Sequence, residues 1–305
     1  MLVIVCPGQG SQTPGFFTPW LELPAFRESI EISQSASGLD LLTYGTLSDA
    51  DTIKDTAVAQ PLIVSASIAS YAALNAAGLE KVAGVAGHSV GELAAASIAG
   101  VFDTATAMEL VTKRGAEMAK AAALTSSSMA AVLGGDRDEV VSFLESRGLF
   151  AANYNGSGQI VAAGSTEGIA ALIAEPMAGT RVVSLAVAGA FHTSFMEPAV
   201  AELANFAAGL ATSDPSMKLW TNKNGEIISS GSEYLQLLVN QVSNPVRWDL
   251  CMEAMVAAGV TGLIELSPAG ALTGMAKRGM PGVETLALKT PDQLDAAIEL
   301  AKNHG

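Results

Sequence analysis

One serine of this chain is flanked by glycines at a position where a nucleophile could be held for attack. Ser89 lies in the sequence GHSVG at residues 87–91, directly after an apolar run. In a G-x-S-x-G turn between a strand and a helix, the glycines let two backbones approach closely and the serine hydroxyl is exposed. The alternative is chance, because 30 of the 305 residues are glycine. An alanine-rich stretch over 90–99 follows the turn, and this context favours a nucleophile that forms a covalent acyl ester.

A serine nucleophile needs a base, and the chain has only 3 histidines. His88 adjoins Ser89, so its side chain leaves the turn in another direction, and His304 is the second-last residue and is expected to fray. His192 remains, just before an S-x-x-E sequence at 194–197 that is typical of a helix capping box. A helix N-terminus disfavours the charged imidazole, so we expect a neutral His192 that accepts the serine proton. A hydrogen-bonded core histidine is the alternative.

Arg114 is the second residue whose position suggests chemistry. At helical spacing from Arg114 the sequence has only apolar side chains, namely Ala107, Leu110, Val111, Met118 and Ala121. Lys113, in contrast, has Glu109 and Glu117 at four-residue spacing and is predicted to lie on an exposed face. A buried arginine must find an anion. Two interpretations stay open: an internal ion pair, or a clamp on a substrate carboxylate.

A glycine-rich turn follows the first predicted strand. Gly8-Gln9-Gly10 could begin a dinucleotide-binding fingerprint, but Thr13 occupies the third glycine position and no helical pattern follows closely. Such a turn at the carboxyl end of a strand can instead supply an N–H to an oxyanion opposite Ser89. No cluster has the spacing of metal ligands, so neither a metal nor a cofactor is expected.

The composition excludes several partner classes. With 16 Lys and Arg against 30 Asp and Glu the net charge is −14, which argues against nucleic acid and anionic membranes. The start of the chain lacks the features of a signal peptide or membrane span. Cys6 and Cys251 show no redox or metal spacing and are expected in the core. A cytoplasmic protein is therefore predicted.

Ser89, His192 and Arg114 must be positioned by a larger framework of helices and strands. In the first half of the chain the sequence pattern predicts that strands alternate with helices. Buried strands are predicted over 2–6 and 82–87, and helices over 57–77, 90–99 and 104–123. This alternation is typical of a mainly parallel sheet covered on both faces. After residue 189 the pattern resumes with predicted helices over 195–211, 232–242, 249–258, 271–279 and the C-terminus, and strands over 218–221, 262–266 and 283–288.

A compact unit interrupts this framework. Residues 125–128 are predicted to form a linker, and the elements after it follow the order β-α-β-β-α-β of a ferredoxin-like unit. Its predicted elements are 129–133, 136–147, 150–154, 159–163, 166–178 and 181–187. We therefore predict a large α/β domain of residues 1–124 and 190–305, with a small domain of residues 125–189 inserted in it. A cleft between the two is a favoured ligand site.

Seven short motifs, in this order, resemble those of malonyl-CoA:acyl-carrier-protein transacylases, the acyltransferases of fatty-acid and polyketide synthesis. The likeness covers nearly the whole chain. The motifs are PGQGSQ at 7–12, GHSVGE at 87–92, Arg114-Gly115, MAAV at 129–132, GAFH at 189–192, NPVRW at 244–248 and LTG at 272–274.

The resemblance implies a fold, an activity and residue roles. It implies an α/β-hydrolase-like large domain with a ferredoxin-like small domain, and ping-pong transfer of malonyl from coenzyme A to the phosphopantetheine thiol of acyl carrier protein. Ser89 would be the acylated nucleophile, His192 its base and Arg114 the ligand of the malonyl carboxylate. Backbone N–H groups of Gln9 and Val90 would form the oxyanion hole.

The resemblance also implies that the backbone carbonyl of Gln241 orients His192, so that no acidic third member of a triad is needed. Phe191 stands where some relatives have serine, which bears on substrate choice. Because acyl carrier proteins are typically acidic, docking would depend on local bases, and Lys277 and Arg278 are the pair we select. A serine hydrolase and a non-catalytic carrier-binding protein are the alternative functions.

Overall fold

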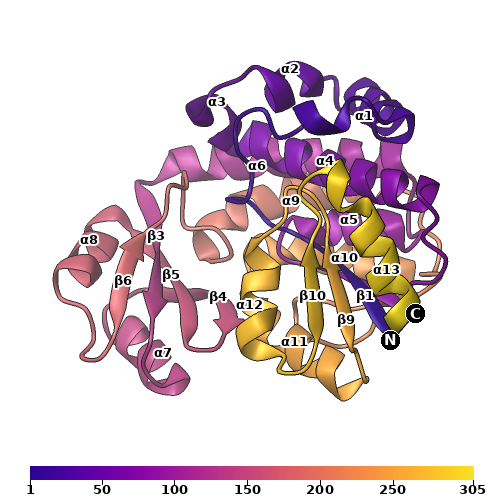
Figure 1. Cartoon of the computed structure of the whole chain (residues 1–305). Helices are drawn as coiled ribbons and strands as arrows, with labels where there is room; N and C mark the ends of the chain where they lie inside the picture. Colours follow the sequence, from indigo (N-terminus) through magenta and orange to yellow (C-terminus); the bar gives the residue numbers. More distant parts are fainter.

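The computed structural model describes residues 1–305 and contains two β-sheets flanked by helices (Figure 1). The large sheet has the strand order β10-β9-β1-β2-β7, and all its pairings are parallel. Its strands are β1 Leu2–Cys6, β2 Gly84–Gly87, β7 Lys218–Leu219, β9 Gly262–Glu265 and β10 Glu284–Ala287. The mainly parallel sheet predicted for this part of the chain is confirmed.

The central strand β1 is buried on both faces because every residue in it is apolar. Leu2, Ile4 and Cys6 face the larger core, while Val3 and Val5 face a second core on the opposite side. Side chains of a strand alternate between its two faces, so an uninterrupted apolar run serves both layers at once. Cys6 and Cys251 are both fully buried, as predicted.

Helices cover both faces of the large sheet. The larger core lies under α4, α5, α6, α9 and α13, and the second core lies under α11 and α12. The helices outside the small domain are α1 Pro24–Ser37, α2 Leu41–Thr46, α3 Ala50–Lys54, α4 Thr56–Ala76, α5 Gly91–Ile98, α6 Thr104–Leu124, α9 Glu197–Ala207, α10 Gly231–Gln241, α11 Trp248–Ala257, α12 Ala271–Gly279 and α13 Leu294–His304. Short 3-10 turns occur at Thr18–Trp20, Ser194–Met196 and Pro291–Gln293.

Helix α4 is the one helix long and apolar enough to cross a membrane by length and composition. Of its most apolar window, 78% is buried inside the protein, against α1 and α6. The same length and hydropathy are found in core helices of soluble proteins.

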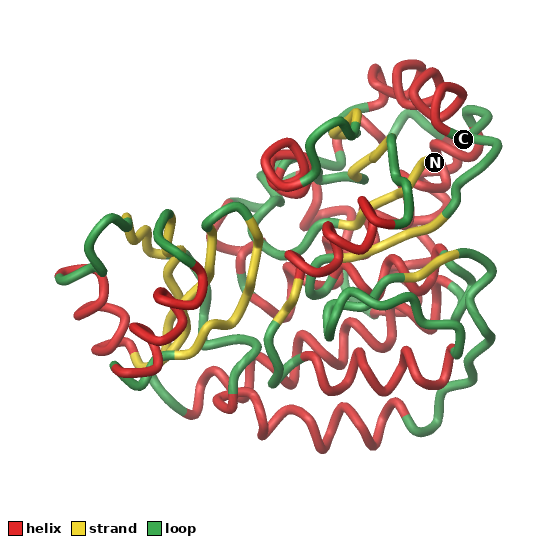
Figure 2. Tube along the Cα trace, turned by 90° about the horizontal axis from the view of Figure 1, so that it is seen from below, coloured by secondary structure: helices red, strands yellow, loops and turns green.

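The small sheet lies at one end of the molecule, to the side of the large sheet (Figure 2). Its strand order is β6-β3-β5-β4-β8, and the first four strands are antiparallel neighbours. Its elements are β3 Ser127–Leu133, α7 Arg137–Ser146, β4 Phe150–Gly156, β5 Gln159–Ser165, α8 Thr166–Ala174 and β6 Arg181–Ser184. This is the order of a ferredoxin-like unit, and the prediction of that fold is confirmed.

Two details at the junction of the sheets differ from the sequence prediction. Strand β3 begins at Ser127, so the predicted linker is half strand, because Ser127 and Ser128 pair with Ser165 and Gly164 of β5. The Ser127 hydroxyl also accepts a hydrogen bond from Ala190 N at 3.0 Å, which joins the two segments that connect the sheets. In addition, β8 Val246–Arg247, which belongs to the chain after the small unit, pairs in parallel with β4. The small sheet therefore contains a strand that lies outside residues 125–189.

Three neighbouring strands of the large sheet are each followed, at their carboxyl ends, by a polar residue of the candidate site. Gln9 follows β1, Ser89 follows β2 and Asn222 follows β7. Because the strands are parallel, these three segments meet at one edge of the sheet, which in open α/β folds is the edge where ligands bind.

Candidate active site

Ser89 lies on a sharp turn between β2 and α5. Its backbone has φ of 52°, in the left-handed region, and its N–H donates to the Asn222 side-chain oxygen at 2.7 Å. A Cβ on Gly87 would come within 2.1 Å of the Gly91 carbonyl carbon, and a Cβ on Gly91 within 2.2 Å of the Cys6 oxygen. Both glycines are therefore required by close backbone approach, and the turn has the geometry of a nucleophile elbow.

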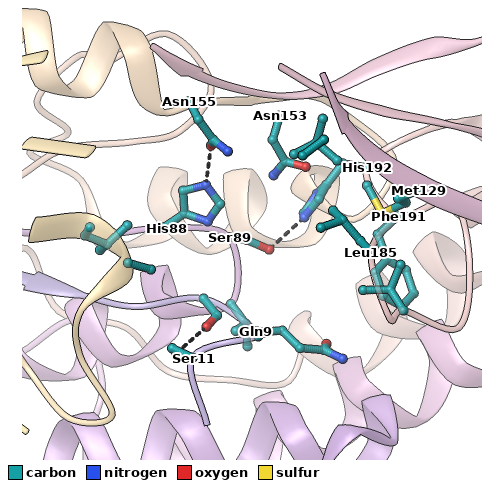
Figure 3. Close-up of a pocket in the computed structure, with 18 of the residues that line it drawn as sticks. Gln9, Ser11, His88, Ser89, Met129, Asn153, Asn155, Leu185, Phe191 and His192 are labelled. Atoms are coloured by element: carbon teal, nitrogen blue, oxygen red, sulfur yellow. Dashed lines mark hydrogen bonds between the residues drawn. The ribbon is translucent and has the colours of Figure 1, made fainter. Parts of the chain in front are cut away.

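His192 contacts the Ser89 hydroxyl directly. The distance between Ser89 Oγ and His192 Nε2 is 2.7 Å (Figure 3). On the other side of the ring, His192 Nδ1 lies 2.8 Å from the backbone oxygen of Gln241. A carbonyl oxygen can only accept, so Nδ1 carries the proton and Nε2 is free to accept one from serine. The structure thus brings Ser89, His192 and Gln241 into one chain of hydrogen bonds.

The imidazole of His192 is held in its neutral form. Burial, followed by the positive charge of Arg114, lowers the pKa of His192 to about 3. The predicted neutral state agrees with this lowered pKa, whose largest cause is burial. Thr193 caps a 3-10 turn here and α9 begins only at Glu197, so the predicted capping box at 194–197 does not form.

Arg114 is buried on α6 and lies beside this pair of side chains. Its guanidinium donates to the side-chain oxygens of Gln60 at 2.5 Å and Gln241 at 2.9 Å. No carboxylate lies within ion-pair distance of it. Burial lowers the pKa of Arg114 to about 10, so the guanidinium stays charged at neutral pH. Of the two interpretations left open, the internal ion pair is not formed.

One cavity of about 300 Å³ connects these groups. Ser89, His192 and Arg114 line it together with Gln9, Val90 and Phe191, and its wall contains strand residues of the small sheet and the turns that follow β1 and β2 of the large sheet. No loop or turn hydrogen bond uses the backbone N–H of Gln9 or of Val90, so both donors remain available. No group of three or more His, Cys, Asp or Glu side chains in the protein could hold a metal ion.

The predicted docking bases lie near the mouth of the cavity. Lys277 and Arg278 are exposed in the last turn of α12, whose first residues line the cavity. Arg278 donates to the side-chain oxygen of Gln159, which also lines the cavity, at 3.3 Å. His304, in contrast, is ordered by contacts with Thr261 and Glu284 rather than frayed, because α13 extends as far as this residue.

Several polar residues of the site were not predicted. Gln60 supports Arg114 from an otherwise apolar stretch of α4, and that isolated amide is a signal that could have located it. The His88 side chain forms no hydrogen bond with Ser89, and its Nε2 lies 2.9 Å from the Asn155 side-chain oxygen of β4. Asn222 and Asn155 carry no local signal, because they meet the site only through the tertiary fold.

A parallel α/β sheet, a serine on a strand-to-helix turn with a neutral histidine, and a charged arginine in the same cavity are typical of serine-dependent acyltransferases. A comparison with family models agrees, since the acyl transferase domain matches residues 3–292. The chain belongs to this family, and within it to the malonyl CoA-acyl carrier protein transacylases, as the following relatives show.

The malonyl CoA-acyl carrier protein transacylase of Mycobacterium tuberculosis is 46% identical over 304 residues, covering 98% of this chain and 100% of the relative. That of Escherichia coli is 33% identical over 303 residues, covering 97% and 98%. Among solved structures, MCAT from M. tuberculosis has a TM-score of 0.93 at 47% identity, covering 99% of both chains. A malonyl-transacylase solved in complex with its type II polyketide acyl-carrier protein has a TM-score of 0.93 at 28% identity, covering 98% of this chain and 99% of that one.

Proposed function

We propose that the protein transfers malonyl from malonyl-CoA to the phosphopantetheine thiol of an acyl carrier protein. The observation that carries this proposal is the buried, charged and ion-pair-free Arg114 in the same cavity as the Ser89–His192 pair. An enzyme for neutral acyl groups has no use for such a cation, whereas malonyl ends in a carboxylate. The names of the relatives support the same substrate and acceptor.

In the first half-reaction Ser89 Oγ attacks the thioester carbonyl and passes its proton to His192 Nε2. Backbone N–H groups of Gln9 and Val90 donate to the oxyanion that forms. The intermediate collapses to a malonyl-serine ester, and coenzyme A leaves as a thiol with the proton from His192. The carrier thiol then attacks the ester by the same steps in reverse, with His192 as base. The Gln241 carbonyl holds the required tautomer throughout.

Arg114 selects the acyl group in this mechanism. Gln60 and Gln241 bind its terminal nitrogens with neutral amide oxygens, so they fix its position without cancelling its charge. Each terminal nitrogen keeps a second N–H, and a malonyl carboxylate can accept both. Phe191 lies in the cavity wall directly before His192, and we propose that it limits the room beside malonyl C2. We place the reaction in the cytoplasm, where two unpaired cysteines stay reduced, and assign no cofactor to it.

The intact mass of the protein tests this function. After incubation with malonyl-CoA we expect the mass to increase by one malonyl group, which persists until holo acyl carrier protein is added. The group should then appear on the carrier. Loss of the malonyl group to water at the same rate without carrier would identify a hydrolase, and no mass increase would refute catalysis through a covalent ester.

Lys277 and Arg278 provide a test of carrier docking. Changing both to Glu is expected to raise KM for the carrier by about tenfold, since an exposed ion pair contributes up to about 1 kcal/mol, while acylation by malonyl-CoA stays unchanged. Both constants are measured by following each half-reaction separately. The matched control changes Lys81 and Lys302, which are exposed far from the cavity, to Glu. Equal effects from both pairs would show that only the net charge matters and would remove Lys277 and Arg278 from the docking site.

A further inference from the structure

A network of buried polar side chains surrounds the Gln241 amide, and two of its members, Glu92 and Asn222, have no part in the proposed mechanism. Its centre is Glu92, a glutamate in the first turn of α5 that is 1% exposed. One side-chain oxygen accepts the Asn222 backbone N–H at 2.6 Å, and the other accepts from the side-chain nitrogen of Gln241. Burial raises the pKa of Glu92 to about 8, but an N–H donor faces each of its oxygens, and this geometry requires the ionised carboxylate. Apart from the turn hydrogen bond that Glu92 N donates to the Ser89 carbonyl at 3.0 Å, Glu92 has no hydrogen bond to Ser89 or His192. Its side chain therefore acts on the site through Asn222 and Gln241.

Asn222 and Glu92 together determine which way the Gln241 amide points. The Gln241 nitrogen has two acceptors, the Glu92 carboxylate and the Asn222 side-chain oxygen at 3.2 Å. Asn222 itself cannot turn, because its side-chain nitrogen donates to the Gly87 carbonyl at 2.8 Å while its oxygen accepts from Ser89 N. With its nitrogen directed to Glu92, the amide of Gln241 presents its oxygen to Arg114.

Packing alone does not fix this orientation. The oxygen and nitrogen of a glutamine amide have nearly the same size, so their positions can be exchanged at little steric cost and hydrogen bonds decide between them. A second cavity of about 420 Å³ adjoins the network and is lined by both Glu92 and Gln241. The backbone carbonyl of Gln241, which accepts from His192, is held separately by the end of α10. Gln241 thus accepts a hydrogen bond from His192 through its backbone carbonyl and one from Arg114 through its side-chain oxygen.

We propose that Glu92 is a positioning residue for substrate selection, which orients the Gln241 amide so that its oxygen holds Arg114 toward the acyl carboxylate. The proposal rests on the proposed function, in which Arg114 binds malonyl. In this proposal Glu92, Gln241 and Arg114 select the acyl group, whereas Ser89 and His192 carry out the acyl transfer. Loss of Glu92 should impair recognition of a carboxylated acyl group and spare the serine–histidine chemistry.

The test is the nearly isosteric Glu92→Gln variant. A glutamine side chain has one acceptor oxygen where a carboxylate has two. We expect this oxygen to accept from the fixed Asn222 backbone N–H. The Gln241 amide nitrogen then loses its acceptor at residue 92, and the amide turns. Its nitrogen would then face the Arg114 guanidinium, donor against donor. We expect kcat/KM for malonyl-CoA to fall by about 10- to 100-fold, the usual effect of losing a hydrogen bond to a charged group. Acetyl transfer should change by less than about twofold, because Ser89, His192 and the Gln241 carbonyl are untouched.

A double variant shows whether the effect passes through Arg114. In an Arg114→Ala background, Glu92→Gln is expected to lower malonyl transfer no further. Additive losses, or equal losses of malonyl and acetyl transfer, would overturn the proposal. Failure of the proposed function has a different signature, because Arg114→Ala alone would then fail to distinguish the two substrates.

Two more variants complete the test. Gln241→Leu keeps the backbone carbonyl and removes the amide, so it should show the same loss of malonyl over acetyl transfer even if Glu92→Gln folds poorly. Glu265→Gln is the matched control, since Glu265 is fully buried and accepts from the N–H groups of Leu272 and Thr273 at the start of α12. It should lower the melting temperature without changing the ratio of malonyl to acetyl transfer. A change of that ratio as large as in Glu92→Gln would show that any buried carboxyl has this effect.

Discussion

Ser89→Ala is expected to take up no malonyl group and to lose transfer activity by about 10⁴- to 10⁶-fold, as when other serine nucleophiles are removed. The fold should be preserved, because alanine meets the same left-handed backbone strain as serine at φ of 52° and only one hydroxyl is lost. The measurement is an intact mass after incubation with malonyl-CoA, together with the rate of malonyl transfer to holo carrier. A thermal melt should give a transition close to that of the unmodified protein.

His192→Ala is the companion variant, because it keeps the nucleophile and removes only its base. It should still become labelled, but about 10²- to 10⁴-fold more slowly. Peptide mapping of the acylated protein should locate the group on Ser89. A malonyl group on any other residue, or rapid labelling of Ser89→Ala, would show that the serine on the strand-to-helix turn is not the acyl carrier of this enzyme.

Arg114→Ala is expected to cost malonyl transfer about 2–5 kcal/mol, because the substrate carboxylate would be left desolvated and unpaired in the cavity. Acetyl transfer should change far less and could improve, since a buried cation no longer faces an apolar methyl group. The measurement is kcat/KM for malonyl-CoA and acetyl-CoA with both forms of the enzyme. The ratio of the two constants is the informative quantity, because it cancels any shared loss of folded protein.

Lys113→Ala is the matched control, on the preceding residue of the same helix. Lys113 is exposed to solvent in part and pairs with Glu117 at 2.9 Å, outside the cavity. Its removal should leave the selectivity for malonyl unchanged. Equal losses of malonyl and acetyl transfer in Arg114→Ala would show instead that this arginine supports the structure of α6 and does not bind the substrate.

Much of the fold could be predicted because its elements carry strong apolar patterns. The apolar run of β1 and the long apolar helix α4 are found within a residue of their predicted positions. Helix α1 was missed, because Ser29 and Ser33 occupy its buried face beside Phe26 and Ile30 and weaken the apolar periodicity. Strand β8 was also missed, since its two residues pair only when the small sheet is already present.

The candidate site also contains residues that the sequence indicates and residues that it does not. Ser89 and Arg114 could be singled out from their local sequence, one by flanking glycines and the other by the apolar stripe around it. Asn222 and Gln60 could not, because their function depends on partners 133 and 54 residues away in the chain. Side-chain amides are common on protein surfaces, and only the folded structure distinguishes those that are buried and fully bonded.

The pairing of β8 with β4 has a consequence for anyone who wishes to exchange substrate-binding modules between enzymes of this type. Cutting at the proposed boundaries, before residue 125 and after residue 189, would remove β4 and leave Val246–Arg247 without their neighbour. A transplanted unit would then present an unmatched strand edge to its new host. The structural unit to be exchanged is therefore discontinuous in the sequence. A functional chimera must include residues 244–248 of the donor together with the inserted domain.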